Sequence, residues 1–104
     1  MIQRVMLFAG TTEGRLLCEF LAEKKITACV CVTTSYGEQL LPSGNHMEIC
    51  TGALDRAQME EKMQSFGPQL VIDATHPYAR LATENIHNAC NSLNIPYLRV
   101  IRCV

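Results

Sequence analysis

The sequence has no tryptophan, few aromatic residues, and only 18% charged residues among its 104 positions. The formal net charge is −1, so no basic field would attract nucleic acid or an anionic membrane surface. No apolar run approaches the ~20 residues that a membrane-spanning helix needs. Met1 leads directly into a predicted strand, without the pattern of a signal peptide. We therefore expect a cytoplasmic protein that binds neither nucleic acid nor membranes.

Six cysteines are present, but no two of them form a C-x-x-C pair. Cys29 and Cys31 are two positions apart, which places both on one face of a strand and makes a poor metal clip. Most of the others lie within apolar patterns, where cysteine behaves as a small hydrophobic residue. We expect reduced, structural cysteines and no metal site, which again favours the cytoplasm.

A chain of this length can form one small domain with a single core, but not two. Apolar strands and amphipathic helices alternate along it, without a repeat or a low-complexity linker. Such alternation is typical of a parallel sheet with right-handed crossovers. We predict one Rossmann-like α/β domain over residues 1–104, with an open parallel sheet of five strands in the order 3-2-1-4-5 and helices on both faces.

The predicted strands are short apolar runs, of which the third is the weakest: 5–9, 27–33, 47–51, 70–72 and 97–101. Thr11 or Thr12 can cap the first helix. The apolar stripe of this helix is expected to face the sheet: Leu16, Leu17, Phe20 and Leu21. A helical turn at 38–41 and a loop at 42–46 are predicted between the second and third strands.

A capping box between Asp55 and Gln58 predicts the start of the next helix. Gly67 and the proline after it end that helix. Its core-facing side chains are spaced by four and three positions: Met59, Met63 and Phe66. We interpret this methionine-rich stripe as packing rather than as a binding surface.

Polar side chains follow the fourth strand. Pro77 disfavours helix at His76 and suits the first position of a helix. Asp73, Thr75 and His76 would then lie between the carboxyl end of a strand and the amino terminus of a helix. They either serve a ligand site or, in the alternative interpretation, Asp73 and Thr75 only cap that helix.

In the predicted strand order, strands 1 and 4 are neighbours and the topological switch point lies between them. The loops at this point are 10–14 and 73–77. Open α/β sheets bind ligands in the crevice at such a point. The two most polar stretches of the chain are therefore expected to meet where a ligand would bind.

The first of these loops only partly matches the dinucleotide fingerprint G-x-G-x-x-G, because glycine occurs only at Gly10 and Gly14. A strand, a glycine, the hydroxyls of Thr11 and Thr12, and a helix amino terminus nevertheless suit an anion. Glu13 would oppose a phosphate if it pointed inward. The alternative is a capped tight turn without a ligand.

The end of the second strand lacks the carboxylate that usually holds an NAD ribose. Neutral hydroxyl-bearing residues stand there instead: Thr33, Thr34, Ser35 and Tyr36. Nothing in this stretch would repel a 2′-phosphate. The pattern favours NADPH over NADH, although no arginine supports the choice.

The chain resembles the amino-terminal half of the precorrin-6A reductase family, which includes cobalt-precorrin-6A reductases. The most specific stretch is Ile72-Asp-Ala-Thr-His-Pro-Tyr-Ala. Supporting stretches occur in the family's order along the whole chain: 10–15, 36–37, 52–55, 95–99 and Arg102. The resemblance implies reduction of one double bond of the precorrin macrocycle, with hydride from a reduced nicotinamide, in cobalamin biosynthesis. It also implies two Rossmann-like halves with the substrate between them.

Three features depart from the family pattern. Ala9 stands where the family commonly has a second glycine, and Ser35 where it often has an acid. Chains of the family are longer, and their second half is absent here. Either this chain is a fragment of a longer one, or the remainder is on another chain. We expect the isolated half to bind cofactor without necessarily turning over substrate.

With this resemblance, the candidate cofactor-binding residues come from three loops: Gly10, Thr11, Thr12, Glu13, Thr34, Ser35, Tyr36, Asp73, Ala74 and Thr75. The candidate substrate-binding residues are His76, Pro77, Tyr78, Arg99 and Arg102. His76 is the candidate catalytic residue, as a donor of a hydrogen bond or a proton. Two alternatives remain open: a non-enzymatic nucleotide-sensing domain, and a dehydrogenase of another substrate.

Overall fold

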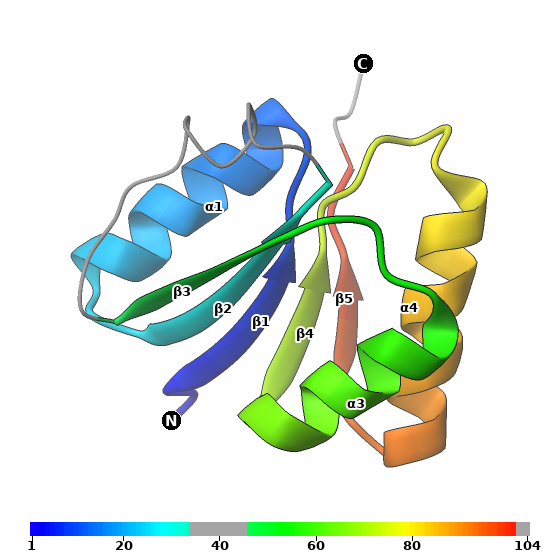
Figure 1. The fold of residues 1–104 in the computed structure, drawn as a ribbon. Helices are drawn as coiled ribbons and strands as arrows, with labels where there is room; N and C mark the ends of the chain where they lie inside the picture. The colour runs from blue at the N-terminus through cyan, green and yellow to red at the C-terminus, as the bar shows by residue number, and fades with distance from the viewer. Residues whose placement is uncertain (34–45, 102–104) are drawn as a thin grey trace.

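Five parallel strands form one sheet in the order β3-β2-β1-β4-β5 (Figure 1). The computed structural model describes residues 1–33 and 46–101. The strands are β1 (Arg4–Phe8), β2 (Thr27–Val32), β3 (Met47–Thr51), β4 (Leu70–Asp73) and β5 (Tyr97–Arg99). The predicted order is confirmed, and so are the bounds of β3. β5 is two residues shorter than predicted, and the turn and most of the loop predicted at 38–46 lie outside the described residues.

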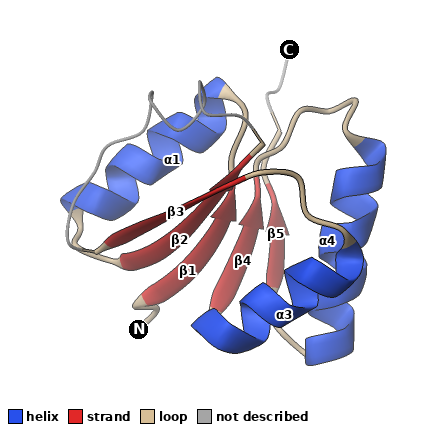
Figure 2. Ribbon diagram, viewed as in Figure 1, coloured by secondary structure: helices blue, strands red, loops and turns tan. Residues whose placement is uncertain are grey.

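Helices cover both faces of the sheet, as predicted (Figure 2). The helix α1 (Thr12–Glu23) lies on one face, and α3 (Arg56–Phe66) and α4 (Arg80–Leu93) lie side by side on the other. Among the helices in the described ranges, none is long and apolar enough to cross a membrane.

The two faces of the sheet carry separate halves of the core, because successive strand residues point to opposite sides. The half under α1 includes Val5, Leu7, Val30, Ile72 and Cys18. The half under α3 and α4 includes Met6, Cys29, Met59, Met63 and Ile86. The two methionines are buried as predicted, and Phe66 packs against them while partly exposed. All five cysteines in the described ranges are free thiols.

The predicted stripe of α1 is wrong at two of its four positions. Leu16 is 54% exposed and Phe20 is 49% exposed, whereas Gly14, Cys18 and Leu21 face the sheet. A Cβ on Gly14 would lie 3.0 Å from Ala9, so the small residue lets the helix approach β1 closely. This contact sets the rotation of the helix, which turns Leu16 and Phe20 away from the sheet.

Local signals at helix ends are confirmed. Thr11 is the N-cap of α1, and its hydroxyl accepts a hydrogen bond from the Gly14 amide. Asp55 and Gln58 form the predicted capping box of α3. Gly67 ends that helix in the left-handed conformation, with φ of 68°. The caps at Thr11 and Asp55 follow β1 and β3 and therefore lie towards the carboxyl edge of the sheet, whereas Gly67 leads to the amino end of β4.

Candidate functional site

The loops that follow β1 and β4 meet at the carboxyl edge of the sheet, as the predicted switch point requires. β1 and β4 pair directly, and the Ala74 amide donates to the Phe8 carbonyl at 2.9 Å. The Thr11 hydroxyl donates to the Ala74 carbonyl at 2.7 Å. The first turn of α1 therefore lies against the start of the loop after β4, and the two loops are neighbours at the carboxyl edge of the sheet.

Gly10 and Gly14 serve different purposes in the first loop. Gly10 has a φ of +137°, which side chains rarely allow, and a Cβ there would meet nothing within 4 Å. The space in front of Gly10 is thus open to another molecule. Gly14, by contrast, is in close contact with Ala9 and Ala74. One glycine shapes the crevice and the other packs the helix against the sheet.

Thr11 has a structural part in this loop. Its hydroxyl donates to Ala74 and accepts from Gly14, so it clamps the loop to β4 and caps α1. Thr11 therefore forms the capped turn that the sequence analysis gave as the alternative to a ligand-binding loop. Thr12 is exposed and Glu13 is half-buried, both in the first turn of α1, whose amides can face an anion.

The helix after β4 begins at Arg80, not at the predicted Pro77. His76 to Ala79 form a turn closed by the Ala79 amide, which donates to the His76 carbonyl at 2.9 Å. Pro77 occupies the second position of this turn, where its fixed φ is also favoured. The N-cap residue is Ala79, and no side chain caps the helix. The capping alternative for Asp73 and Thr75 is therefore wrong.

Asp73 is the only polar residue among the described residues that is fully buried, and donors surround its carboxylate. Oδ1 accepts from the Thr75 amide at 3.1 Å, from the Thr75 hydroxyl at 2.7 Å, and from Arg99 Nη1 at 3.2 Å. Oδ2 accepts from the hydroxyls of Thr83 and Tyr97, both at 2.8 Å. Asp73 orients Thr75, and it also ties β4 to α4 and β5.

These hydrogen bonds also control ionisation. Burial by itself would raise the pKa of Asp73, but the donors of Thr75, Thr83 and Tyr97 outweigh it and lower the pKa below its usual range. Burial and the adjacent carboxylate raise the pKa of the Tyr97 phenol, which therefore stays protonated and donates. Thr83 and Tyr97 were not predicted as site residues, because their contact with Asp73 spans 10 and 24 positions.

Arg99 joins the loop after β4 to the edge strand β5. Its Nη1 donates to the carbonyls of Asp73 and Thr75 at 3.1 and 2.9 Å, besides contacting the Asp73 carboxylate. These hydrogen bonds fix the Nη1 side of the guanidinium. Because the side chain is 23% exposed, the rest of the guanidinium can reach a ligand. Arg99 thus lies at the predicted substrate side of the crevice.

His76 and Tyr78 are exposed at the tip of the loop. His76 Nδ1 accepts from the Tyr78 amide at 3.1 Å, and the two rings lie 5.1 Å apart. This bond directs the proton of a neutral imidazole to Nε2, which can donate to a ligand. His76 neither caps a helix nor packs in the core.

A small cavity on the α3 and α4 side opens at the carboxyl ends of β1 and β2. Its volume is about 100 Å³. It is lined mainly by apolar and small side chains: Phe8, Ala9, Cys31, Val32, Thr33, Gly52, Ala53, Leu54, Met59, Thr75, Ala82 and Ile86. We name this cavity the apolar slot. Of these residues, the sequence analysis considered only Thr33 and Thr75 as ligand residues. Gly52, a glycine directly after a strand, could have indicated this part of the site.

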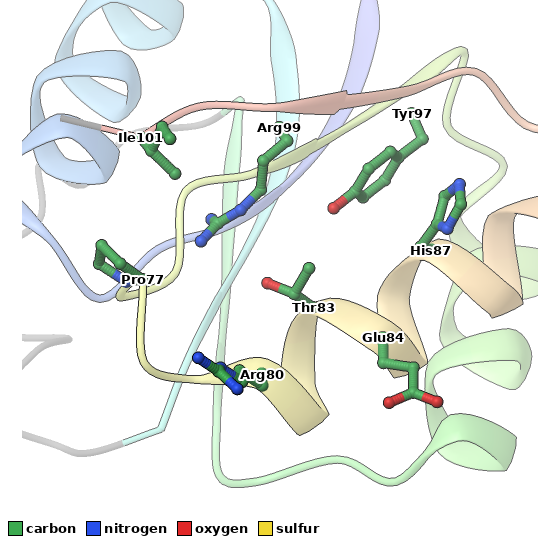
Figure 3. A pocket seen from close by; sticks show the side chains of 8 residues that line it. All are labelled: Pro77, Arg80, Thr83, Glu84, His87, Tyr97, Arg99 and Ile101. Carbon is green, nitrogen blue, oxygen red and sulfur yellow. The ribbon is translucent and has the colours of Figure 1, made fainter. Parts of the chain in front are cut away.

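A larger groove of about 520 Å³ lies between α4 and β5 (Figure 3). We name it the arm groove. Its lining residues come from the loop after β4, from one face of α4 and from β5: Pro77, Arg80, Thr83, Glu84, His87, Tyr97, Arg99 and Ile101. His87 is exposed, and its ring lies 4.9 Å from the ring of Tyr97. His87 was not among the site residues predicted from the sequence.

Four candidate residues, Thr34, Ser35, Tyr36 and Arg102, lie outside the described residues. Thr33, which precedes them, is exposed at the end of β2. Within 1–33 and 46–101, no three His, Cys, Asp or Glu side chains are grouped as metal ligands. The described site is therefore built from two loops, the apolar slot and the arm groove.

Comparisons with known proteins agree with this architecture. Residues 4–104 match the family model described as Precorrin-6x reductase CbiJ/CobK. The cobalt-precorrin-6A reductase of Methanothermobacter thermautotrophicus is 33% identical over 99 residues, covering 94% of this chain and 33% of the relative. That of Synechocystis sp. is 30% identical over 98 residues, covering 94% and 38%.

Solved structures give the same fold. A structure titled CobK precorrin-6A reductase has a TM-score of 0.83 at 25% identity, over 98% of this chain and 40% of that one. The Bordetella bronchiseptica enzyme WbmH in complex with NAD+ has a TM-score of 0.79 at 14% identity, over 91% and 37%, and shows the fold alone. This chain spans between a third and two-fifths of these proteins. By the match over nearly its entire length, the chain belongs to the precorrin-6x reductase CbiJ/CobK family.

Proposed function

We propose that this chain forms the NADPH-binding part of a reductase that acts on precorrin-6A or cobalt-precorrin-6A in cobalamin biosynthesis. The observation that carries the proposal is the meeting of two loops at the switch point, where the open space before Gly10 lies beside the loop that Asp73 anchors. The family supplies the reaction, because its curated members bear the name cobalt-precorrin-6A reductase. The remaining part of the active protein corresponds to the portion of those relatives that this chain does not span.

The residues at the crevice fit a dinucleotide. The open space before Gly10 and the first turn of α1 suit a pyrophosphate, which binds where backbone amides can approach it closely. The Thr11 hydroxyl is already bonded, so in this proposal backbone groups hold the phosphates. The related fold of WbmH, whose title records NAD+, supports a nicotinamide cofactor of this kind.

The apolar slot fits the adenine end of the same cofactor. It opens beside Thr33 at the end of β2, next to the expected ribose position, and small or apolar side chains form its walls. A flat aromatic ring suits such a slot better than a phosphate or a carboxylate does. The absence of an acid at Thr33 and the three residues after it favours NADPH over NADH.

On the substrate side, the loop after β4 presents donors from a rigid base. When bound, the reduced nicotinamide supplies the hydride, and the protein supplies placement and electrostatics. In this proposal His76, at the exposed tip of the loop, donates a hydrogen bond or a proton to the macrocycle, and its contact with the Tyr78 amide through Nδ1 supports Nε2 as the donor atom. Asp73 and Arg99 hold the first part of the loop through Thr75, the residue next to His76.

Titration of the protein with NADPH and NADH tests the cofactor assignment. Gly10→Val introduces a side chain into the open space and strains a φ of +137°, so NADPH affinity should fall at least about tenfold. Gly67→Val is the matched control, because Gly67 also has positive φ but lies at the end of α3. This control should bind NADPH as the unaltered chain does.

Tighter binding of NADH than of NADPH would contradict the argument from the end of β2. Equal binding by Gly10→Val and the unaltered chain would contradict the crevice. For the reaction itself, a full-length protein containing this chain should oxidise NADPH when precorrin-6A or cobalt-precorrin-6A is added. NADPH binding without any such oxidation would favour the nucleotide-sensing alternative.

A further inference from the structure

We propose that the arm groove binds carboxylate arms at the edge of the substrate, with Arg80, Arg99 and His87 as the recognising side chains. The inference rests on the proposed function for the identity of the substrate, a macrocycle that carries many carboxylates. It adds a binding site on α4 and β5, outside the two loops that the sequence indicated. Figure 3 shows the groove with these side chains around it.

Arg99 offers a preoriented fork at the wall of the groove. Its four hydrogen bonds to described residues all use Nη1, on Asp73 and Thr75. Within residues 1–33 and 46–101, no hydrogen bond uses the side edge formed by Nε and Nη2, and this edge matches the two oxygens of a carboxylate. Because the guanidinium is already anchored, little side-chain freedom is lost when a carboxylate binds.

The face of α4 extends this site along the groove. Four lining residues lie on one side of the helix, because each is three or four positions from a residue one turn away: Arg80, Thr83, Glu84 and His87. Arg80 and His87 are two turns apart, about 10 Å along the axis. An exposed arginine at one end and an imidazole at the other can therefore contact two different arms of one ligand. The His87 ring can donate from an N–H in either protonation state.

The rest of the lining suits the stems of such arms. Pro77, Ile101 and the ring of Tyr97 give the groove apolar walls, against which short methylene chains can pack. Glu84 is the one carboxylate in the lining, and Figure 3 shows it pointing away from Arg99. A volume of about 520 Å³ accommodates arms rather than a whole macrocycle. The macrocycle itself would then lie over the loop after β4, near His76.

Binding of uroporphyrin III, a stable tetrapyrrole with carboxylate arms on every ring, tests this site. The dissociation constant is measured by absorbance titration of the 104-residue chain and of two variants. Arg80→Gln removes a cation from the groove, and we expect it to weaken binding about tenfold. Arg15→Gln removes the same charge from the exposed side of α1, on the other face of the sheet, and we expect a change below about twofold.

A second measurement locates the ligand. In amide NMR spectra, uroporphyrin III should shift the resonances of Thr83 and His87, which line the groove. Equal weakening by the two arginine variants would show general charge attraction and overturn the proposal. Shifts confined to residues outside the groove would overturn it as well.

NADPH titration of the same proteins separates this inference from the proposed function. Arg80→Gln should bind NADPH as the unaltered chain does, because Arg80 does not line the crevice before Gly10 or the apolar slot. If no protein binds NADPH while Arg80→Gln alone loses uroporphyrin III, the cofactor role fails and the groove stands. If NADPH binds and uroporphyrin III affinity is the same in all three proteins, the groove fails and the cofactor role stands.

Discussion

Replacing Asp73 by asparagine should destabilise this fold more than any change to one of its partners. The carboxylate is fully buried and accepts from Thr75, Thr83, Tyr97 and Arg99. An asparagine keeps the shape but turns one acceptor into a donor that faces other donors, and it leaves the Arg99 cation without its counter-charge. Breaking a buried pair in this way costs about 3–5 kcal/mol.

The lower end of that range applies here, because the Arg99 side chain is 23% exposed and water can partly replace its partner. We therefore expect a loss of about 3 kcal/mol in the free energy of unfolding. At ~4–8 °C for each kcal/mol in a domain of this size, the melting temperature should fall by about 12–24 °C. Thr83→Val and Tyr97→Phe each remove one hydrogen bond to the charged group and should cost about 1.5 kcal/mol.

Urea unfolding followed by circular dichroism, together with thermal melts, measures these differences. Asp55→Asn is the matched control: the capping residue is exposed, and asparagine caps helices as well as aspartate does, so its stability should hardly change. A loss for Asp73→Asn no greater than that for Tyr97→Phe would refute the reasoning, since it would mean that the charge contributes little.

The pH dependence of the unfolding free energy is an independent test of the Asp73 charge. The pKa of Asp73 is lowered in the folded state, so the ionised carboxylate contributes stability at pH values above its unfolded pKa, ~3.9. That contribution is lost as the pH falls through the lower, folded pKa. Unfolding measured between neutral pH and acid should therefore show a component below about pH 4 that is missing in Asp73→Asn.

Two further changes probe the loops. His76→Ala should leave the melting temperature and the NADPH affinity nearly unchanged, because the His76 side chain is exposed and makes one hydrogen bond to the loop. In a full-length protein the same change should strongly reduce turnover. Unchanged turnover would remove His76 from the site. Gly14→Val should cost about 2 kcal/mol or more in urea unfolding, because its Cβ would lie 3.0 Å from the Ala9 backbone; full stability would show that α1 can move away from β1.

Several features of this protein follow from local sequence alone. The alternation of apolar runs with helical patterns indicated five parallel strands, and right-handed crossovers left few possible orders, of which the predicted one is confirmed. The capping box at Asp55 and the glycine at Gly67 determined where α3 begins and ends. The positions of the loops at 10–14 and 73–77 also followed, since strand order brings them to one crevice. Each of these depends on neighbours in sequence or on a general rule of chain topology.

The tertiary structure alone decided how the site is assembled. The sequence indicated a helical start at Pro77 and an α1 stripe that included Leu16 and Phe20. Packing instead selected Arg80 as the start, and Gly14 with Cys18 on the buried side of α1. The partners of Asp73 on α4 and β5 are distant along the chain, and no periodicity indicates which hydroxyls a buried carboxylate will reach. The apolar slot and the arm groove are likewise spaces between elements. Their shapes depend on how close helices and strands approach, which is a property of packed surfaces and not of any single segment.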